Sequence, residues 1–566
     1  MKFAAGVLSA LKCGPVLALT ALLGALSLLS GCLRIGGGAA SANAKDRPSA
    51  ARFVDVAESA GLHYQWTIEG KRPLNILQTI GNGCAFLDYD NDGFLDILLV
   101  GPKLALYKGD GKGHFTDVTA ATGLEKFSGH FLGCAVGDVD GDGYEDIYIS
   151  GYRAALLLHN EGGRTFRDIT REAGLKPQPW GTSCAFAETV PGSGRLDLYV
   201  ANYAVFGPHT VPQLCKEQGI ETSCGPRYYK PLLGVLYRND GHGHFTDVTR
   251  ASGLSAANGR GLGVAFADFD GSGHPGLAIA NDEMPGDLFK PVGRGLRYAN
   301  IGEKSGTAFD RDGGIHGGMG IDWGDYDNDG KLDLCVATFQ NEAKSLYHNE
   351  GEDRFSDMGF PTGLSAATIP YVAFGCKFFD YDNDGWLDLV IANGHVQDNI
   401  QQINQTATYR QPTQLFHNKG DSPTTFEDVS RLCGPDLERP IVGRGLAVGD
   451  YDNDGREDIL IADAEGRPLL LHNESNTRGH WLGVRLIGTK SNRDGYGAMV
   501  TAVVGGRTLT RQCQTDGSYL SASDPRVHFG LGSASRVDRL TVRWPSGRTT
   551  TQENLPADRY VTLTER

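Results

Sequence analysis

The sequence predicts an all-β fold assembled from a four-stranded unit that recurs along most of its 566 residues. Two recurring phrases lead to this prediction. The first is the acidic run D-x-D-x-D-G-x-x-D, which follows a glycine-led apolar segment, and the second is Phe-x-Asp, which follows an apolar segment ending in Asn. Short apolar runs separated by Gly-rich and Asp-rich turns are typical of strands. Because both phrases return in the same order, mostly at intervals of about 50 to 80 residues, the chain is a repeat protein.

The acidic phrase is present in five complete copies, with carboxylates at positions 1, 3, 5 and 9. These are Asp88, Asp90, Asp92 and Asp96; Asp138, Asp140, Asp142 and Asp146; Asp325, Asp327, Asp329 and Asp333; Asp380, Asp382, Asp384 and Asp388; and Asp450, Asp452, Asp454 and Asp458. A sixth copy keeps only Asp268 and Asp270, and a seventh place at 188–197 has lost most of its acids. The sequence therefore contains seven units.

Each unit offers a glycine-led strand, the acidic loop, a second strand, an Asn-terminated strand and the Phe-x-Asp strand. Four short strands in about 50 residues are typical of a β-propeller blade. The repeat region opens at Phe53 with a Phe-x-Asp strand and closes at Asn473 without one. We therefore predict a seven-bladed propeller whose N-terminal strand completes the last blade and leaves no free sheet edge. An open β-solenoid is the alternative.

The density of acids in each loop predicts a bound cation. Two carboxylates about 4 Å apart repel by roughly 4 kcal/mol at an effective dielectric constant near 20. Convergent hard oxygen ligands suit Ca²⁺ better than Mg²⁺, and an EF-hand is excluded because its closing ligand is a Glu at position 12 between helices. We predict about five structural Ca²⁺ ions, whose ten positive charges would bring the formal charge from -15 to -5. Asp268 and Asp270 form a weaker candidate, and a metal-free turn is the alternative.

The first 31 residues have the pattern of an export signal. Lys2 and Lys12 flank the start, an apolar run follows, and the run ends in Leu-Ser-Gly before Cys32, as in a bacterial lipobox. We predict a lipoprotein signal peptide at 1–31, lipidation of Cys32 and a flexible tether at 32–51; an uncleaved membrane anchor is the alternative. The protein is then exported and anchored to the cell envelope, at the outer membrane or cell surface. The net charge of -15 and the lack of a dense Lys/Arg run argue against nucleic acid as a partner.

The acidic loops resemble the FG-GAP/VCBS repeats of integrin α-chain propellers, and this resemblance covers residues 52–475. A different β-rich segment follows at 476–566. Its phrases "SNRDGYGA", "DGSYLS", "VHFGLG" and "WPSG" resemble an ASPIC/UnbV domain. The combination is similar to the cartilage acidic protein family and its bacterial homologues. This resemblance implies an extracellular calcium-binding propeller without an established reaction.

Residues that recur in every unit are interpreted as architecture. His159, His348, His417 and His472 each precede the recurring Asn, and we assign them to the blade scaffold rather than to metal sites. Cys84, Cys134, Cys184 and Cys376 occupy one repeated position and are predicted to be small buried hydrophobic residues. Cys215 and Cys224 instead lie in an insertion at 202–231, and the exported context favours a disulfide between them. Cys335, Cys433 and Cys513 are left unassigned.

Three long inserts, at 202–231, 281–319 and 393–412, are the candidates for function, because binding surfaces are usually built on loops of a rigid scaffold. Their ligand-binding candidates are Tyr228, Tyr229, His316, His395 and Tyr409. We predict adhesion, or binding of a glycan or protein ligand, at the cell surface. One alternative is a lyase-like carbohydrate-active enzyme at the channel mouth, with His316, His395 and Asp322 as its catalytic set; another is an assembly partner of an exported protein. No nucleophile motif or phosphate loop accompanies that set, so we lean against an enzyme. No oligomeric state is predicted.

Overall fold

The computed structural model describes residues 51–293, 295–476 and 479–566. Strands and turns make up nearly all of these residues, and no described α-helix is longer than five residues. The predicted all-β class is therefore confirmed. The predicted signal peptide, Cys32 and nearly all of the tether lie outside the described residues. Within the described ranges, no helix is long and apolar enough to cross a membrane.

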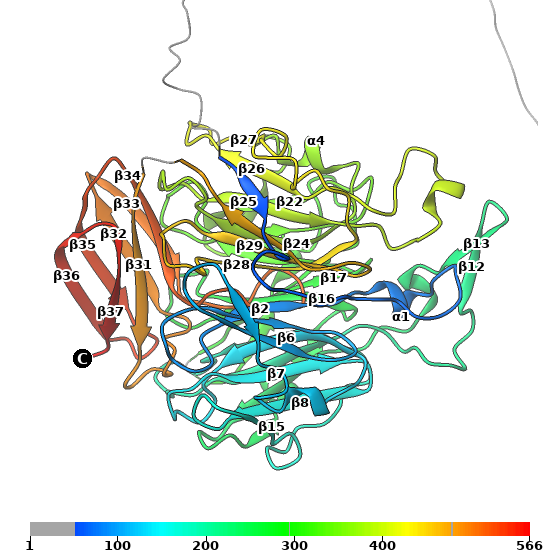
Figure 1. The fold of residues 1–566 in the computed structure, drawn as a ribbon, viewed down its shortest axis with the longest axis horizontal. Coiled ribbons are helices and arrows are strands. Elements are labelled where there is room, and N and C mark those ends of the chain that lie inside the picture. Colours follow the sequence, from blue (N-terminus) through cyan, green and yellow to red (C-terminus); the bar gives the residue numbers. More distant parts are fainter. Residues whose placement is uncertain (1–50, 294, 477–478) are drawn as a thin grey trace, which may run out of the picture. The chain divides into compact units, whose positions relative to one another are not determined.

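Strands β1 to β30, apart from β12 and β13, form seven sheets of four antiparallel strands (Figure 1). Sheet 1 contains β2 (Cys84–Leu87), β3 (Asp96–Leu99), β4 (Ala105–Gly109) and β5 (Phe115–Asp117); sheet 2 contains β6 (Phe131–Gly137), β7 (Asp146–Gly151), β8 (Ala154–Asn160) and β9 (Phe166–Asp168); sheet 3 contains β10 (Gly181–Ala187), β11 (Asp197–Asn202), β14 (Val235–Asn239) and β15 (Phe245–Asp247). Sheet 4 contains β16 (Gly261–Ala267), β17 (Gly276–Asn281), β18 (Asp287–Pro291) and β19 (Tyr298–Asn300); sheet 5 contains β20 (Ile321–Gly324), β21 (Asp333–Val336), β22 (Ser345–Gly351) and β23 (Arg354–Asp357). Sheet 6 contains β24 (Ala373–Phe379), β25 (Asp388–Asn393), β26 (Gln414–Asn418) and β27 (Phe426–Asp428); sheet 7 contains β28 (Gly443–Gly449), β29 (Asp458–Asp463), β30 (Leu469–Asn473) and β1 (Phe53–Asp55).

The seven sheets pack through their first strands. Contacts run from β2 to β6, β10, β16, β20, β24 and β28 in turn, and β28 contacts β2 again. Sheet 7 takes its fourth strand from the N-terminus, since β1 pairs antiparallel with β30 and Phe53 lies opposite Asn473. First strands are buried along their length, as in β6 and β24. Their apolar side chains therefore form cores between neighbouring sheets.

The cysteines behave as small apolar side chains. Cys84, Cys134, Cys184 and Cys376 lie fully buried on first strands, and burial raises the pKa of the Cys84 thiol to about 12. Cys335, Cys433 and Cys513, which the sequence left unassigned, are also free and buried. All seven thiols are buried, as is typical of inert structural cysteines.

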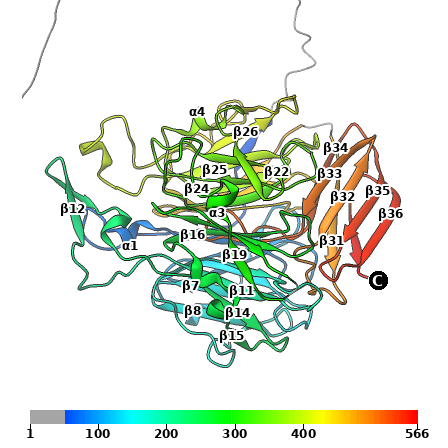
Figure 2. The same cartoon turned by 180° about the vertical axis from the view of Figure 1, so that it is seen from behind.

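Short helices and one hairpin fill the connections between strands. They are α1 (Ile76–Thr79), α2 (Thr249–Ser252), α3 (Gly302–Ser305), α4 (Leu364–Thr368), the 3₁₀ turns η1 (Leu124–Lys126), η2 (Pro226–Tyr228), η3 (Leu254–Ala256) and η4 (Ile400–Gln402), and the hairpin of β12 (Leu214–Glu217) and β13 (Ile220–Ser223). Asn75 begins α1 with a capping box that also uses Gln78. Figures 1 and 2 both show this hairpin beside α1, on the opposite side of the repeat sheets from β31–β37.

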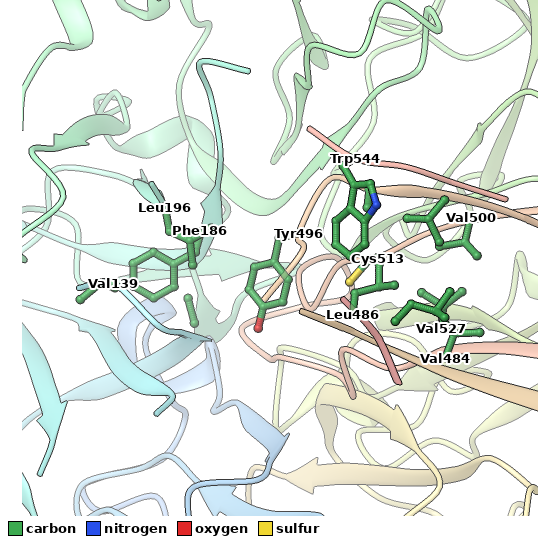
Figure 3. Packing of buried hydrophobic residues seen from close by; sticks show 14 of the residues in the cluster. Val139, Phe186, Leu196, Val484, Leu486, Tyr496, Val500, Cys513, Val527 and Trp544 are labelled. Atoms are coloured by element: carbon green, nitrogen blue, oxygen red, sulfur yellow. The ribbon is translucent and has the colours of Figure 1, made fainter. Parts of the chain in front are cut away.

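The last strands form a separate pair of sheets, the C-terminal domain (480–566). One sheet has the order β34 (Val527–Gly532), β31 (His480–Ile487) and β37 (Arg559–Thr564), and the other has the order β33 (Arg507–Gln512), β32 (Met499–Val504), β35 (Arg536–Arg543) and β36 (Thr549–Pro556). Its core continues into the repeat region. Figure 3 shows Trp544 and Val500 on the side of this domain, Tyr496 in the middle, and Phe186 and Leu196 on the side of sheet 3, all within one buried cluster.

A segment of the C-terminal domain, 516–524, contacts the first strand of every repeat sheet; we call it the plug. Its hydrogen bonds, from sheet 1 to sheet 7, join Phe86 N to Ala522 O, Cys134 N to Leu520 O, Leu520 N to Ser183 Oγ, Phe266 N to Asp516 Oδ2, Ile321 N to Ser518 O, Lys377 Nζ to Asp516 O, and Val448 N to Ser523 Oγ. Glycine is needed beside it, because a Cβ on Gly83 would lie 1.9 Å from Leu520 O. The plug therefore fills the space between the seven first strands.

Candidate metal centres

Seven loops join the first strand of each repeat sheet to the second; they are loops 1 to 7, at 88–96, 138–146, 188–197, 268–276, 325–333, 380–388 and 450–458. In the complete copies, the carboxylate at position 1 accepts a hydrogen bond from the backbone N–H of the Gly at position 6, as from Gly455 to Asp450 (2.8 Å). Position 4 also has a left-handed backbone, with φ of 57° at Asn91 and 61° at Asn383. Gly and Asn adopt this conformation at low cost, which explains their place in the phrase.

The acids of these loops are held in surroundings that disfavour a bare negative charge. The acid at position 9 of each complete loop is fully buried and accepts a hydrogen bond from a backbone N–H. These acids are Asp96, Asp146, Asp333, Asp388 and Asp458. Burial raises the pKa of Asp96 to about 8, and of Asp458 to about 7. Carboxylates in such a setting are stabilised by a nearby cation.

Some carboxylate oxygens remain without a partner. Five such oxygens are buried and accept no hydrogen bond from the residues that the structure describes: Asp88 Oδ1 and Asp90 Oδ1 in loop 1, Asp325 Oδ1 in loop 5, Asp382 Oδ1 in loop 6 and Asp452 Oδ1 in loop 7. A buried oxygen without a donor is costly, and coordination to a hard cation would satisfy it. Loops 1, 5, 6 and 7 therefore each hold a carboxylate oxygen that a Ca²⁺-like ion would satisfy, and in loop 1 a lysine competes for that place.

A histidine joins the acids in four loops, which the sequence analysis did not foresee. The ring Nδ1 of His348 lies 3.2 Å from Asp333 and 3.4 Å from Asp327, and that of His159 lies 3.0 Å from Asp146. His417 and His472 lie equally close to position 9 of their loops. Each of the four forms a group with positions 3 and 9 that is close enough to hold a metal ion. The assignment of the four histidines to the blade scaffold alone is therefore too narrow. In the sequence, the only signal of a shared role was that each of them directly precedes the recurring Asn.

Loops 1, 3 and 4 differ from these four. In loop 1 the Lys108 ammonium pairs with Asp90 and Asp92, although the acids Asp88, Asp90 and Asp96 are also close enough together for a metal ion. In loop 4, Arg543 pairs with Asp268, and Lys290 lies 3.1 Å from Asp270. In loop 3, Glu188 instead accepts a hydrogen bond from Asn492 N (2.7 Å).

Comparison with known families agrees with this division of the chain. A family described as an FG-GAP-like repeat matches residues 88–149, 325–391 and 380–461, and one described as ASPIC and UnbV matches residues 488–566. The chain carries FG-GAP-like repeats followed by an ASPIC and UnbV domain. The resemblance stated from the sequence is therefore confirmed, and the matched repeats coincide with loops 1, 2, 5, 6 and 7.

The chain is also similar to cartilage acidic protein 1 from three vertebrates. It is 26% identical to the Xenopus tropicalis protein over 82% of this chain and 70% of that protein. The human and mouse proteins are 27% and 26% identical over 63% of this chain, which spans only 49% and 50% of their lengths. These relatives support membership of the same group of repeat proteins.

Solved structures overlap this chain only loosely. An Agrocybe aegerita lectin titled for recognition of non-reducing terminal N-acetylglucosamine is 16% identical, covering 70% of this chain and 94% of its own, with a TM-score of 0.38. The Niastella koreensis GH74 enzyme is 11% identical, covering 88% and 69%, with a TM-score of 0.40. Overlaps of this quality carry no argument about function.

The ASPIC/UnbV domain contacts all seven loops of the FG-GAP-like repeats. The hydrogen bonds join Arg485 to Asn91, Asp494 to Asp138 N, Asn492 to Glu188, Gln512 to Asp268 N, Arg511 to Asn328, Gly532 N to Asn383 O, and Tyr560 to Asp450. One strand end of every repeat sheet therefore meets the C-terminal domain, and we call this side the loop face.

A cavity of about 350 Å³ lies along this junction, between loops 1, 2 and 7 and the C-terminal domain. Asp88, Glu145, Asp494, Arg485 and Arg526 contribute charges of both signs to its lining. Much of that charge is already paired, since Arg526 pairs with Asp524 (2.8 Å) and Glu145 accepts a hydrogen bond from Asp88 N (2.9 Å).

The inserts emerge at the opposite ends of the sheets. Each second strand starts at its loop, so β11, β17 and β25 end on the far side, where 202–231, 281–319 and 393–412 begin; we call this side the insert face. Cys215 and Cys224 form a disulfide across the β12–β13 hairpin. Asn399 Nδ2 of the third insert donates to Glu221 O of the hairpin (2.7 Å).

The predicted ligand-binding residues differ in their exposure. Tyr228 is 61% exposed, whereas Tyr229, His316, His395 and Tyr409 are buried. His395 Nδ1 accepts a hydrogen bond from Gln397 N, and burial near Arg444 lowers its pKa to about 3. Asp322 lies elsewhere, ion-paired with Lys377 beside the plug. The structure therefore does not bring His316, His395 and Asp322 together as one exposed catalytic set, and Tyr228 alone of the five presents its ring to solvent.

Proposed function

We propose that this chain is an exported β-propeller, closed from seven blades and stabilised by Ca²⁺, which binds a glycan or protein ligand through its insert face. The observation that carries the proposal is the division of the molecule into two faces. The C-terminal domain occupies the loop face and its plug fills the space between the first strands. The insert face is left as the broad surface built from non-repeated sequence.

Ring closure is supported by the order of the contacts. The first strands contact one another in chain order and return from β28 to β2, and β1 supplies the fourth strand of sheet 7. A ring leaves no unpaired sheet edge that could recruit another chain. Seven sheets in this order support a propeller rather than an open solenoid.

Calcium is supported by the chemistry of the loops. Buried carboxylates with raised pKa values and buried oxygens without donors are stabilised by a divalent cation. Positions 1, 3, 5 and 9 of the loop would hold the ion, and its charge would offset the repulsion between them. The ion would act on stability, since the C-terminal domain covers these loops.

The insert face has the features of a binding surface. Tyr228 shares its insert with two further exposed apolar side chains, Val205 (47%) and Val211 (85%). The disulfide and the hydrogen bonds between inserts hold this surface in shape, which lowers the entropic cost of binding. Exposed aromatic residues on a rigid support often dominate binding energy. Attachment through Cys32 would hold the protein at the cell envelope.

The test is a binding screen of the purified protein on glycan and matrix-protein arrays, with Ca²⁺ and with chelator. Tyr228→Ala is expected to weaken a hit at least tenfold, or about 1.4 kcal/mol. Leu432→Ala, which alters a 67% exposed side chain outside the inserts, is the matched control. Equal binding by both variants would contradict the assignment of the insert face. Folded, calcium-loaded protein without any hit would favour an assembly partner instead.

A further inference from the structure

One position of the third strand faces the loop in every repeat sheet. Strand pairing places Ile97 opposite Tyr107 in sheet 1 and Leu334 opposite Tyr347 in sheet 5. Lys108 and His348 directly follow these two tyrosines and therefore occupy the same position in their sheets. By the same registers, the seven residues at this loop-facing position are Lys108, His159, Arg238, Lys290, His348, His417 and His472. Four sheets therefore carry a histidine there, and three carry a lysine or arginine.

The residue type at this position follows the acid content of the loop, with one exception. Arg238 and Lys290 belong to sheets 3 and 4, whose loops have lost two or more of their four acids. His159, His348, His417 and His472 belong to sheets whose loops are complete. Sheet 1 departs from the rule, because its loop has all four acids and its loop-facing residue is Lys108.

Lys108 neutralises its loop directly. Its ammonium pairs with Asp90 at position 3 and lies 2.9 Å from Asp92 at position 5. In sheet 5 the corresponding acid at position 3, Asp327, lies 3.4 Å from the His348 ring instead of from an ammonium group. An ammonium among the carboxylates supplies the positive charge that a metal ion would supply, and it repels a second cation.

Cationic side chains also occur in loops 5 and 7, but they lie differently. Lys331 and Arg456 belong to position 7 of the loop itself and each pairs only with the acid at position 5, Asp329 or Asp454. The acids at positions 3 and 9 there still face a histidine. Lys331 therefore provides a control for a lysine that pairs with position 5 of a loop but not with position 3.

We infer that Lys108 is the built-in cation of loop 1, and that the chain binds four metal ions rather than five, one in each sheet whose loop-facing residue is histidine. This inference rests on the proposed Ca²⁺ binding and deepens it. It corrects the stoichiometry expected from the acidic phrase alone. With four ions, eight positive charges would bring the formal charge from -15 to -7.

The experiment counts Ca²⁺ bound per chain by equilibrium dialysis and elemental analysis, on protein whose folding is checked by circular dichroism. The wild type is expected to hold four ions. Lys108→His, which copies the other four sheets, is expected to hold five, and Lys108→Met, which keeps the side-chain length without its charge, is also expected to gain one. His348→Lys is expected to hold three.

The matched control is Lys331→His, which changes a lysine near loop 5 and is expected to leave the count at four. Five ions in the wild type, or four in both folded Lys108 variants, would overturn the inference about Lys108 while leaving Ca²⁺ binding intact. No bound ion in any variant would instead overturn the proposed role of calcium. The melting temperature in Ca²⁺ gives a second readout, since a gained ion should raise it and a lost ion should lower it.

Discussion

Replacement of Lys377 by methionine tests whether the plug is seated as the structure describes. Lys377 Nζ lies 2.8 Å from Asp322 Oδ1 and donates to Asp516 O of the plug (2.8 Å). Its side chain is 10% exposed, and that of Asp322 is 1% exposed. Lys377→Met removes the cation and leaves the carboxylate of Asp322 buried without its counter-charge. Loss of one partner from a buried ion pair costs about 3 to 5 kcal/mol.

A double variant separates the buried charge from other effects. Asp322→Asn together with Lys377→Met removes both charges, while the amide oxygen can still accept the hydrogen bond that Phe378 N donates to Asp322. The remaining cost is that of the Asp516 carbonyl left without a hydrogen-bond donor, which is about 1 to 3 kcal/mol. The double variant should therefore be more stable than Lys377→Met alone.

Urea unfolding in the presence of Ca²⁺, followed by fluorescence and circular dichroism, measures these differences at constant m-value. Lys304→Met, at an exposed position of α3, is the control and should change the free energy of unfolding by less than about 0.5 kcal/mol. A Lys377→Met variant as stable as this control would refute the reasoning. So would a double variant whose loss equals the sum of the two single losses.

Three further predictions concern the cations, the hairpin and acid stability. Transfer into chelator should lower the melting temperature measured by calorimetry. At a free Ca²⁺ concentration of 100 times the Kd, each site contributes about 2.7 kcal/mol to the free energy of unfolding. An unchanged melting temperature would contradict the stabilisation of the loops by bound ions. The double substitution Cys215→Ser and Cys224→Ser should speed amide hydrogen exchange within β12 and β13. It should lower the free energy of unfolding by at most about 3 kcal/mol, because the disulfide limits the entropy of the unfolded chain. Loss of exchange protection across the repeat sheets would show that the hairpin supports more than the insert face. Burial lowers the pKa of His395 to about 3, so its ring is neutral in the folded protein. The stability that the neutral ring contributes is present above its ordinary pKa near 6.5 and is lost as the pH falls towards 3. The free energy of unfolding should fall by about 1.4 kcal/mol per pH unit in this range. His395→Asn should flatten that slope in urea midpoints between pH 6 and 4, and an unchanged slope would assign acid sensitivity to other groups.

The repeat architecture could be predicted because its signals are local. A phrase such as Phe115–Asp117 recurs six times, and the structure places Phe115 opposite Gly109 at the end of the third strand as the pattern requires. The acids of each loop lie within nine residues, so their convergence is visible in the sequence. The all-β class and the family resemblance followed from these signals.

The contacts between distant segments could not be predicted in the same way. The plug shows no periodicity, and its partners lie on seven strands spread over more than half of the chain; five of the hydrogen bonds use backbone N–H groups of those strands, and two use the side chains of Ser183 and Lys377. Gly83 was the nearest hint, since it leaves room for Leu520. The role of Lys108 was hidden for a similar reason. Its acids, Asp90 and Asp92, precede it by 18 and 16 residues, and only strand register brings them together.

The pairing of β1 with β30 sets an order of events during synthesis of the protein. The N–H of Leu470 donates to the side chain of Asp55, 415 residues earlier in the chain. Sheet 7 therefore stays incomplete until translation is almost finished, and the plug is made later still. Until β30 is made, β1 has no partner strand, and its edge can pair with other chains. Closure of sheet 7 therefore has to wait until both ends of the repeat region have been made.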